Sequence, residues 1–206
     1  MKLKKMIASL VIVAVLSTIT VAGTLAYFTD EVTTRNVITT GNIDIVLNEK
    51  TADGLDFPKE GISGVMPGTD VSKIVTITNT GSGTAWIRVQ VNTSIQSATG
   101  EPLPLKLADG SNAVLINAPS EGWLVYPDPG KNENVKPEDV YYYYTTALKP
   151  GQTTKSLFDT VTFAPEMGNE YQDCKVLVDV SAQAVQVANN IPADLKVTSI
   201  AGWPEA

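Results

Sequence analysis

The feature of this sequence that most constrains its fold is a series of short runs in which apolar and polar residues alternate. A β-strand places successive side chains on opposite faces, so such alternation indicates a half-buried strand. The runs are rich in Val, Ile, Thr and Tyr, which suit a pleated surface, and Gly, Pro, Asn or Asp separate them. They lie at residues 43–47, 74–78, 87–91, 141–146, 157–163 and 176–180. Helical periodicity is hard to find, and the pattern predicts an all-β fold, an antiparallel β-sandwich of the jelly-roll type.

The amino end of the chain differs in character from everything that follows it. Three lysines precede an uncharged apolar run over residues 6–21, and small residues end this stretch at Ala26. This pattern predicts a helical signal peptide over residues 1–26, cut between Ala26 and Tyr27. The alternative is an uncleaved anchor, since a helix over residues 6–26 would be about 30 Å long and would cross a bilayer. Either reading places the remaining chain outside the cytoplasm, so we expect a secreted protein that meets the membrane only before cleavage.

Beyond the signal, the chain divides into three stretches. Residues 27–40 form an extended leading segment, residues 41–190 hold the predicted strands, and residues 191–206 form a tail. Within the main domain, residues 97–137 contain six prolines, and we interpret them as an irregular insertion in the sandwich.

Composition argues against several classes of function. The net charge is −7, and it becomes −10 once the three signal lysines are removed. An acidic domain repels phosphate groups, so no nucleic-acid partner is expected. The sequence has no histidine and a single cysteine, Cys174. Without imidazole the usual nucleophile–base pairs and histidine-containing zinc sites cannot form, so we expect no catalytic residue, no metal site and no cofactor. Cys174 is expected to pack as a small hydrophobe.

A run of four tyrosines is the candidate for an aromatic binding surface: Tyr141, Tyr142, Tyr143 and Tyr144. In a strand, two of them would face the core and two would face outward. Outward tyrosines can bind a sugar or a protein partner. The interpretation that we favour is ordinary packing within the sheet.

A set of motifs, taken in order along the chain, carries a family resemblance. Tyr27-Phe28-Thr29-Asp30 directly follows the small residues that end the export signal. The later motifs are Thr40-Gly41-Asn42-Ile43-Asp44-Ile45, Val65-Met66-Pro67-Gly68, Thr76-Ile77-Thr78-Asn79-Thr80-Gly81, Ile87-Arg88-Val89, Leu157-Phe158-Asp159-Thr160-Val161 and Ala184-Val185-Gln186. Together they resemble the TasA and camelysin (CalY) family of secreted precursors over most of residues 1–190.

The resemblance implies a jelly-roll domain that forms fibres in a biofilm matrix or at the cell surface, after a SipW-type signal peptidase has removed the signal. In fibre-forming members the freed amino-terminal segment inserts as a strand into the next subunit. Here that segment is residues 27–40, and its candidate anchors are Tyr27, Phe28, Val32, Val37 and Ile38. The implied partners are further copies of the chain and a related minor fibre subunit. The alternative is that the segment pairs within its own domain.

Two other functions compete with the fibre subunit. One is a monomeric surface adhesin that uses the tyrosine run or the insertion at residues 97–137. The other is a secreted metalloprotease, an activity described for some camelysin-type members. The lack of histidine counts against a protease, so we expect that the chain is not an enzyme.

Overall fold

The computed structural model describes residues 29–33, 43–59, 66–117, 119–131, 134–188, 190–192 and 196–204. In these ranges the fold is all-β, as predicted, and the helical elements there are three 3-10 turns: η1 (Pro137–Asp139), η2 (Asn169–Tyr171) and η3 (Val197–Ser199). None of the helical elements in those ranges is long and apolar enough to cross a membrane. The predicted signal peptide and its cleavage site between Ala26 and Tyr27 lie outside the described residues.

The strands follow one another along the whole described chain. In chain order they are β1 (Thr29–Thr33), β2 (Ile45–Lys50), β3 (Asp70–Ser72), β4 (Ile74–Asn79), β5 (Ala85–Gln96), β6 (Pro102–Leu103), β7 (Val114–Ile116), β8 (Trp123–Tyr126), β9 (Tyr141–Tyr144), β10 (Thr160–Phe163) and β11 (Lys175–Gln186). Every pair among them is antiparallel.

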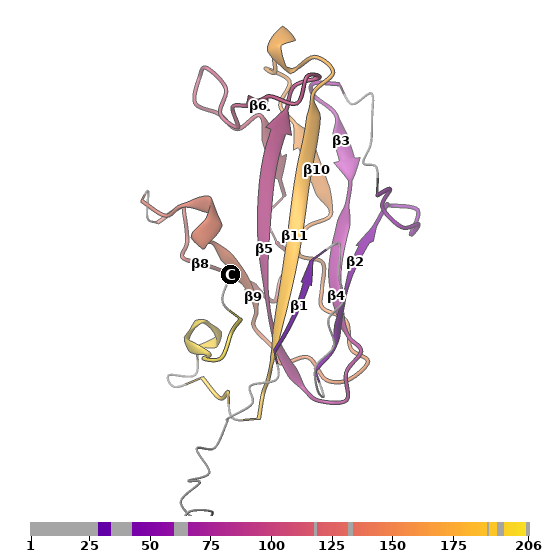
Figure 1. Cartoon of the computed structure of the whole chain (residues 1–206), viewed down its shortest axis with the longest axis vertical. Helices are drawn as coiled ribbons and strands as arrows, with labels where there is room; N and C mark the ends of the chain where they lie inside the picture. Colours follow the sequence, from indigo (N-terminus) through magenta and orange to yellow (C-terminus); the bar gives the residue numbers. More distant parts are fainter. Residues whose placement is uncertain are drawn as a thin grey trace, which may run out of the picture.

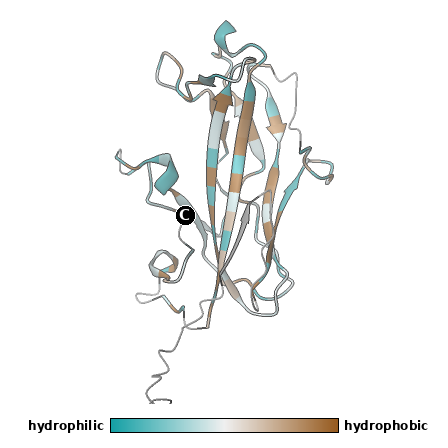
Figure 2. Ribbon diagram, viewed as in Figure 1, coloured by the Kyte–Doolittle hydropathy of each residue, from teal (hydrophilic) through white to brown (hydrophobic). Residues whose placement is uncertain are grey.

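The larger of the two layers is a sheet with the order β1-β11-β5-β9-β8, to which β6 adds beside β5. Its centre is the pair β5–β11, which is in register over all twelve residues of β11, from Lys175 opposite Gln96 to Gln186 opposite Ala85. These two strands run side by side along the length of the domain (Figure 1). Brown and teal segments succeed one another along both of them (Figure 2), because successive side chains face the core and the solvent in turn.

Two smaller sheets, β2-β4 and β3-β10-β7, form the opposite layer. The chain before β10 runs along β4 and joins them. Its Thr154 backbone N–H donates to the Ile77 carbonyl at 2.9 Å, and its Leu157 N–H donates to the Val75 carbonyl at 2.8 Å. The two small sheets therefore act as one layer, and the domain is an antiparallel sandwich of jelly-roll type.

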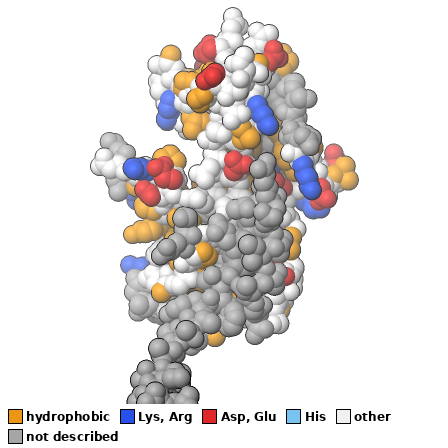
Figure 3. Space-filling view, in the orientation of Figure 1, with side chains coloured by type: hydrophobic (Ala, Val, Ile, Leu, Met, Phe, Trp, Pro, Cys, Tyr) orange, Lys and Arg blue, Asp and Glu red, His pale blue; other side chains and the backbone are white. Residues whose placement is uncertain are grey.

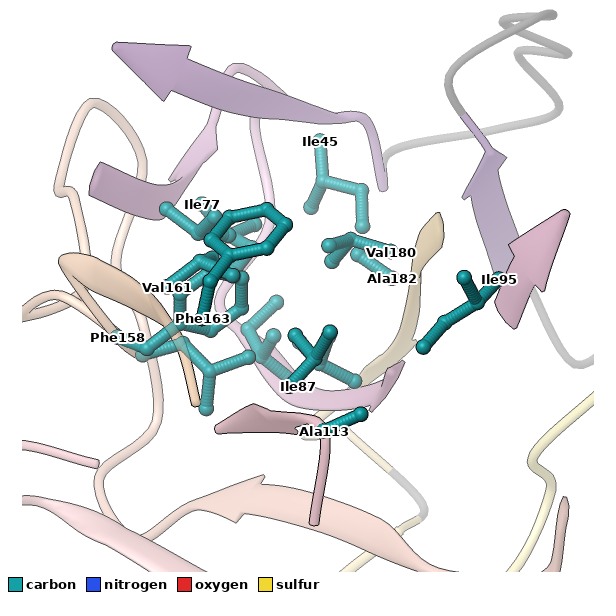
Figure 4. Close-up of a cluster of buried hydrophobic side chains, with 14 of the residues drawn as sticks. Ile45, Ile77, Ile87, Ile95, Ala113, Phe158, Val161, Phe163, Val180 and Ala182 are labelled. Atoms are coloured by element: carbon teal, nitrogen blue, oxygen red, sulfur yellow. The ribbon is translucent and has the colours of Figure 1, made fainter. Parts of the chain in front are cut away.

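Apolar side chains from both layers fill the space between them. Ile45 and Ile77 come from the smaller layer and Ile87 and Val180 from the larger, and they converge around Phe158 (Figure 4). Ile45, Ile77 and Ile87 are completely buried. The side chains that alternate along the predicted strands are thus divided between this core and the outer surfaces.

The insertion at residues 97–137 is more regular than the sequence suggests. It contributes β6, β7 and β8, which pair with β5, β10 and β9 respectively. Its prolines keep each run of pairing short, since proline has no N–H for a strand ladder. Sequence reasoning treated the stretch as a connection because its strands are short and its prolines interrupt the alternation; of the three, β7 pairs with a strand that is distant in sequence.

Candidate functional site

The leading segment of the chain lies at the edge of the larger sheet. β1 pairs with β11 over five residues, from Thr29 opposite Val185 to Thr33 opposite Ser181. In a single chain these residues therefore pair with β11 of their own domain. For donation to a neighbour, β1 must leave this edge, and the β1 strand of another chain must take its place. Among the predicted anchors, Val32 lies opposite Ala182 in this ladder. The remaining four, Tyr27, Phe28, Val37 and Ile38, lie outside the described residues.

β11 is longer than the strand that covers it. β1 occupies residues 181–185 of β11, whereas residues 175–180 have no strand partner on that edge within the described parts of the chain. The upper part of β11 extends beyond the tip of β1 (Figure 1). An uncovered sheet edge presents backbone N–H and C=O groups that another extended segment can complete.

One side chain from the opposite layer reaches this uncovered edge. Lys73, between β3 and β4, is 7% exposed, and its ammonium donates to the Val178 carbonyl at 3.0 Å. Because backbone groups along a strand point alternately to its two sides, Val176 and Val180 face the same edge as Val178. Lys73 therefore binds the middle of the uncovered half of β11. An inward-pointing lysine is one of the devices by which sheet edges resist unwanted pairing.

The charge of Lys73 is balanced inside the sandwich. Its Nζ lies 3.0 Å from Glu49 Oε1 on β2 and 4.8 Å from the centre of the Phe57 ring. The side chain of Glu49 is 16% exposed. A buried charge is costly unless it is paired and hydrogen-bonded, so this ion pair, the Val178 carbonyl and the ring together allow Lys73 to remain there.

The tyrosine run forms β9, next to β5 in the larger sheet. Tyr142 and Tyr144 pack against the main core, while Tyr141 and Tyr143 face the outer side and join a second apolar cluster. Tyr143 is only 5% exposed. Tyr141, Tyr142 and Tyr144 are half-buried, which is compatible with ordinary packing within the sheet.

The carboxyl-terminal segment over residues 196–204 covers the outward tyrosines. Trp203 makes an edge contact with Tyr143, with ring centres 5.9 Å apart. The Arg88 guanidinium lies between the rings of Tyr141 and Trp203, at 4.1 and 4.7 Å from their centres. It also donates to Gln183 Oε1 at 2.7 Å and to the Pro204 carbonyl at 3.1 Å. The tail is therefore a packed part of the larger sheet's outer face.

Trp203→Ala is expected to lower the free energy of unfolding by about 2 kcal/mol, because it removes one aromatic contact and one cation–π contact. Urea unfolding followed by tyrosine fluorescence measures the change. Ile191→Ala, at a tail position that is 75% exposed, is the matched control and should leave the midpoint unchanged. Equal midpoints for the Trp203 variant and the intact chain would show that the tail does not contribute.

On the face drawn in Figure 3 the acidic and basic side chains lie interspersed. Cys174 is half-buried and packs against the main core. Burial raises the pKa of its thiol, which disfavours the reactive thiolate at neutral pH.

The sequence was compared with models of known protein families, and one of them matches. A family model described as "Camelysin metallo-endopeptidase" matches residues 2–102, a stretch that contains β1 to β5 and so includes both the leading strand and Lys73. Over these residues the chain is similar to the camelysin family, in line with the resemblance of its motifs. No curated protein and no solved structure shows a significant match to this chain.

The family description implies a metal-dependent peptidase, but the side chains in the described ranges do not fit a catalytic metal centre. The full sequence contains no histidine, the commonest protein ligand of catalytic zinc. Within the described ranges, no group of three or more Cys, Asp or Glu side chains is placed to hold a metal ion. We therefore derive no catalytic step through a metal.

Sequence reasoning missed two groups that the structure brings together. Lys73 and Glu49 meet between β4 and β2, and Arg88 meets Trp203 across more than a hundred residues of chain. One signal for the first pair was present: Ser72 and Lys73 stand between Val71 and the β-branched run that starts at Ile74. A lysine inside such a stretch indicates either a bulge or an edge device.

Proposed function

We propose that this protein is a secreted structural subunit of extracellular fibres, in a biofilm matrix or at the cell surface, and that it is not an enzyme. The observation that supports this most is the position of β1. It is the first strand in the described part of the chain, it lies at the end of the larger sheet, and its ladder partner is the edge of β11. Such a strand can form the backbone hydrogen bonds of that edge equally well whether it comes from the same chain or from a neighbour.

Exchange of β1 between subunits produces a filament. Each subunit donates its leading strand from one surface and accepts a strand at another, so the contact is heterologous and does not close on itself. Cleavage between Ala26 and Tyr27 by a SipW-type peptidase would free the leading segment for this exchange. The proposed partners are therefore further copies of the chain, together with a related minor subunit.

Two properties of the molecule favour a structural role over the competing functions. Of the tyrosines that would serve a monomeric adhesin, Tyr143 is buried and the other three are half-buried, with their rings packed in the two apolar clusters. The peptidase activity in the family description lacks suitable ligands in this sequence.

Cross-linking across the β1–β11 ladder tests the proposal directly. In a Cys174→Ser background, Thr33→Cys combined with Ser181→Cys places two thiols at opposite register positions, where Cβ atoms lie about 5 Å apart in an antiparallel pair. Oxidised monomer is expected to keep its mobility on a non-reducing gel. Oxidised fibres of the mature chain, grown before oxidation, are expected to give a ladder of covalent multimers.

The matched control is Thr33→Cys with Lys175→Cys, whose second thiol lies six residues further along β11, about 20 Å away. It should form no specific disulfide in monomer or fibre. If the thiols at positions 33 and 181 formed disulfides in fibres only within single chains, strand donation would be contradicted. A mature chain that never assembles, with its amino terminus confirmed at Tyr27, would contradict the fibre function itself.

A further inference from the structure

The larger sheet has a second free edge, at the end opposite β1. β8 closes the strand order there and pairs with β9 on one side, and its other side meets no strand among the residues that the structure describes. Lys73 is bound to the open part of the β11 edge, whereas the four residues of β8 carry no charge. Charged side chains are a usual protection of sheet edges, so the edge of β8 is unprotected.

The backbone groups on the free side of β8 belong to two residues. The Thr145 N–H donates to the Gly122 carbonyl at 2.8 Å. Since backbone groups along a strand point alternately to its two sides, the residues of β8 in step with Gly122 turn theirs toward β9, whereas Trp123 and Val125 turn theirs to the free side. Within the described ranges neither of these two forms a backbone hydrogen bond there. Another extended chain can complete such an edge.

Apolar side chains stand beside these backbone groups. On the outer face of the sheet, Leu124 is 43% exposed and Tyr126 is 53% exposed, and hydrophobic side chains are visible at the surface in the region of β8 (Figure 3). On the inner face, Val125 is half-buried. Exposed apolar side chains next to unpaired backbone groups favour contact with another protein strand.

The charges that flank β8 are already paired within the chain. Just before the strand, Lys155 Nζ lies 2.9 Å from Glu121 Oε2, and just after it, Lys131 Nζ lies 3.0 Å from Asp128 Oδ2. The net charge of the protein is −7, so two copies repel each other on average. Because each flank of β8 is neutral, a second copy meets less repulsion at this edge.

Pro127 selects the register in which two β8 strands fit together. When two identical antiparallel strands continue one sheet, the same residue of each copy lies at the two-fold axis, and the two middle residues of β8 are the candidates. With Leu124 at the axis, Trp123 lies opposite Val125 of the other copy, and all backbone groups on the free sides are paired. With Val125 at the axis, Trp123 would lie opposite Pro127, which has no N–H to donate.

The register with Leu124 at the axis also covers the exposed side chains. On the outer face, Leu124 meets Leu124 of the second copy, and Tyr126 lies opposite Gly122, which has no side chain to obstruct the ring. On the inner face, Trp123 lies opposite Val125. Apolar and aromatic residues directly opposite each other stabilise an antiparallel ladder.

We propose that the free edge of β8 docks the β8 edge of a second copy of this chain, antiparallel and about a two-fold axis at Leu124, so that the two larger sheets become one. The β1–β11 ladder lies at the other end of the sheet and is left intact. A contact of this small size forms weak, transient pairs. Between two fibres the contact repeats along their length, and multivalency strengthens it. The docked edges then join fibres side by side, a consequence that rests on the proposed fibre function.

A cysteine at the axis tests the contact in the mature monomer, without fibres. In the Cys174→Ser background, Leu124→Cys is expected to give a covalent dimer and no larger product on a non-reducing gel. A two-fold contact closes on itself, and Cα atoms that face each other in an antiparallel pair lie within the limit of about 7 Å for a disulfide.

The matched control is Tyr126→Cys in the same background. Tyr126 is more exposed than Leu124, but in this register it lies four residues, about 13 Å, from its counterpart. It should give about tenfold less dimer, because that distance exceeds the reach of a disulfide. Equal yields of dimer from the two variants would overturn the proposal.

Charge substitution at the axis tests the side-by-side association of fibres. Leu124→Lys and Leu124→Glu each place like charges opposite each other, and each is expected to raise the fibre concentration at which bundles appear about three- to tenfold. A one-to-one mixture of fibres of the two variants pairs opposite charges and should bundle as readily as fibres of the intact chain. Light scattering and electron microscopy measure bundling. The length of single fibres should not change, since Leu124 lies outside the β1–β11 ladder.

The outcomes separate this contact from the fibre function. If fibres form but neither charge substitution weakens bundling, or if the mixture of the two variants fails to restore it, the β8 contact is overturned and the fibre function stands. If Leu124→Cys gives the dimer but the intact mature chain never forms fibres, the β8 contact stands and the fibre function is contradicted. Absence of both the dimer and the fibres would overturn both proposals.

Discussion

A mature chain that lacks residues 27–40 is expected to remain monomeric under conditions in which the intact mature chain forms fibres. It loses the strand that it would donate, but it keeps β11 and therefore the edge that accepts a strand. Electron microscopy and sedimentation of the two proteins at equal concentration measure the effect. We expect essentially complete loss of pelletable material, because the proposed contact between subunits consists of this one strand.

The same truncated chain should also stop the growth of intact fibres. It can accept a donated strand at one end of a filament, after which no strand is available for the next subunit. At one truncated chain per ten intact chains, the mean length is expected to fall to roughly ten subunits, since a heterologous filament ends wherever donation ends. A synthetic peptide of residues 27–40 should compete for the same edge, and a peptide of the same composition in scrambled order is the control. Fibres formed by the truncated chain alone would show that the leading segment is not the donor.

Lys73→Met is expected to lower the free energy of unfolding by about 3–5 kcal/mol, which is the usual cost of removing one partner of a buried ion pair. The substitution leaves Glu49 in the sandwich without the ammonium that lies 3.0 Å from its Oε1, and the Val178 carbonyl loses its donor. Urea unfolding at neutral pH measures the change. The effect is large because Lys73 is 7% exposed and water cannot replace the lost partner.

Lys50→Met is the matched control for this prediction. Lys50 pairs with Asp56, but the two side chains are 41% and 88% exposed, and an exposed pair contributes between about 0 and 1 kcal/mol. A second variant, Lys73→Met with Glu49→Leu, removes both charges and is expected to recover most of the loss, as buried ion pairs replaced by apolar residues often do. Equal losses for Lys73→Met and Lys50→Met would contradict the burial argument.

Local alternation was sufficient to predict strands at β2, β4, β5, β9 and β11 and the division of side chains between their faces. Ile87 and Val89 point into the core and Arg88 points out of it, as the spacing of two requires. Tyr141 to Tyr144 divide between the two faces of β9 for the same reason. These properties follow from the geometry of a single extended backbone, so the sequence contains them without reference to the rest of the fold.

The edge of β11 could not be predicted in the same way. That Lys73 reaches Val178, 105 residues further along the chain, depends on how the two layers lie on each other. The docking of Trp203 on Arg88 and the pairing of β7 with β10 likewise join segments that are distant in sequence.

By itself, therefore, the sequence determined an all-β chain, the division of its side chains between core and surface, and the absence of histidine chemistry. The tertiary structure decided which strand ends the sheet, how much of β11 is left uncovered, and which lysine binds that edge. The physical reason is that periodicity along one strand is a short-range property of the backbone, whereas register and edge exposure arise only when segments distant in sequence pack together.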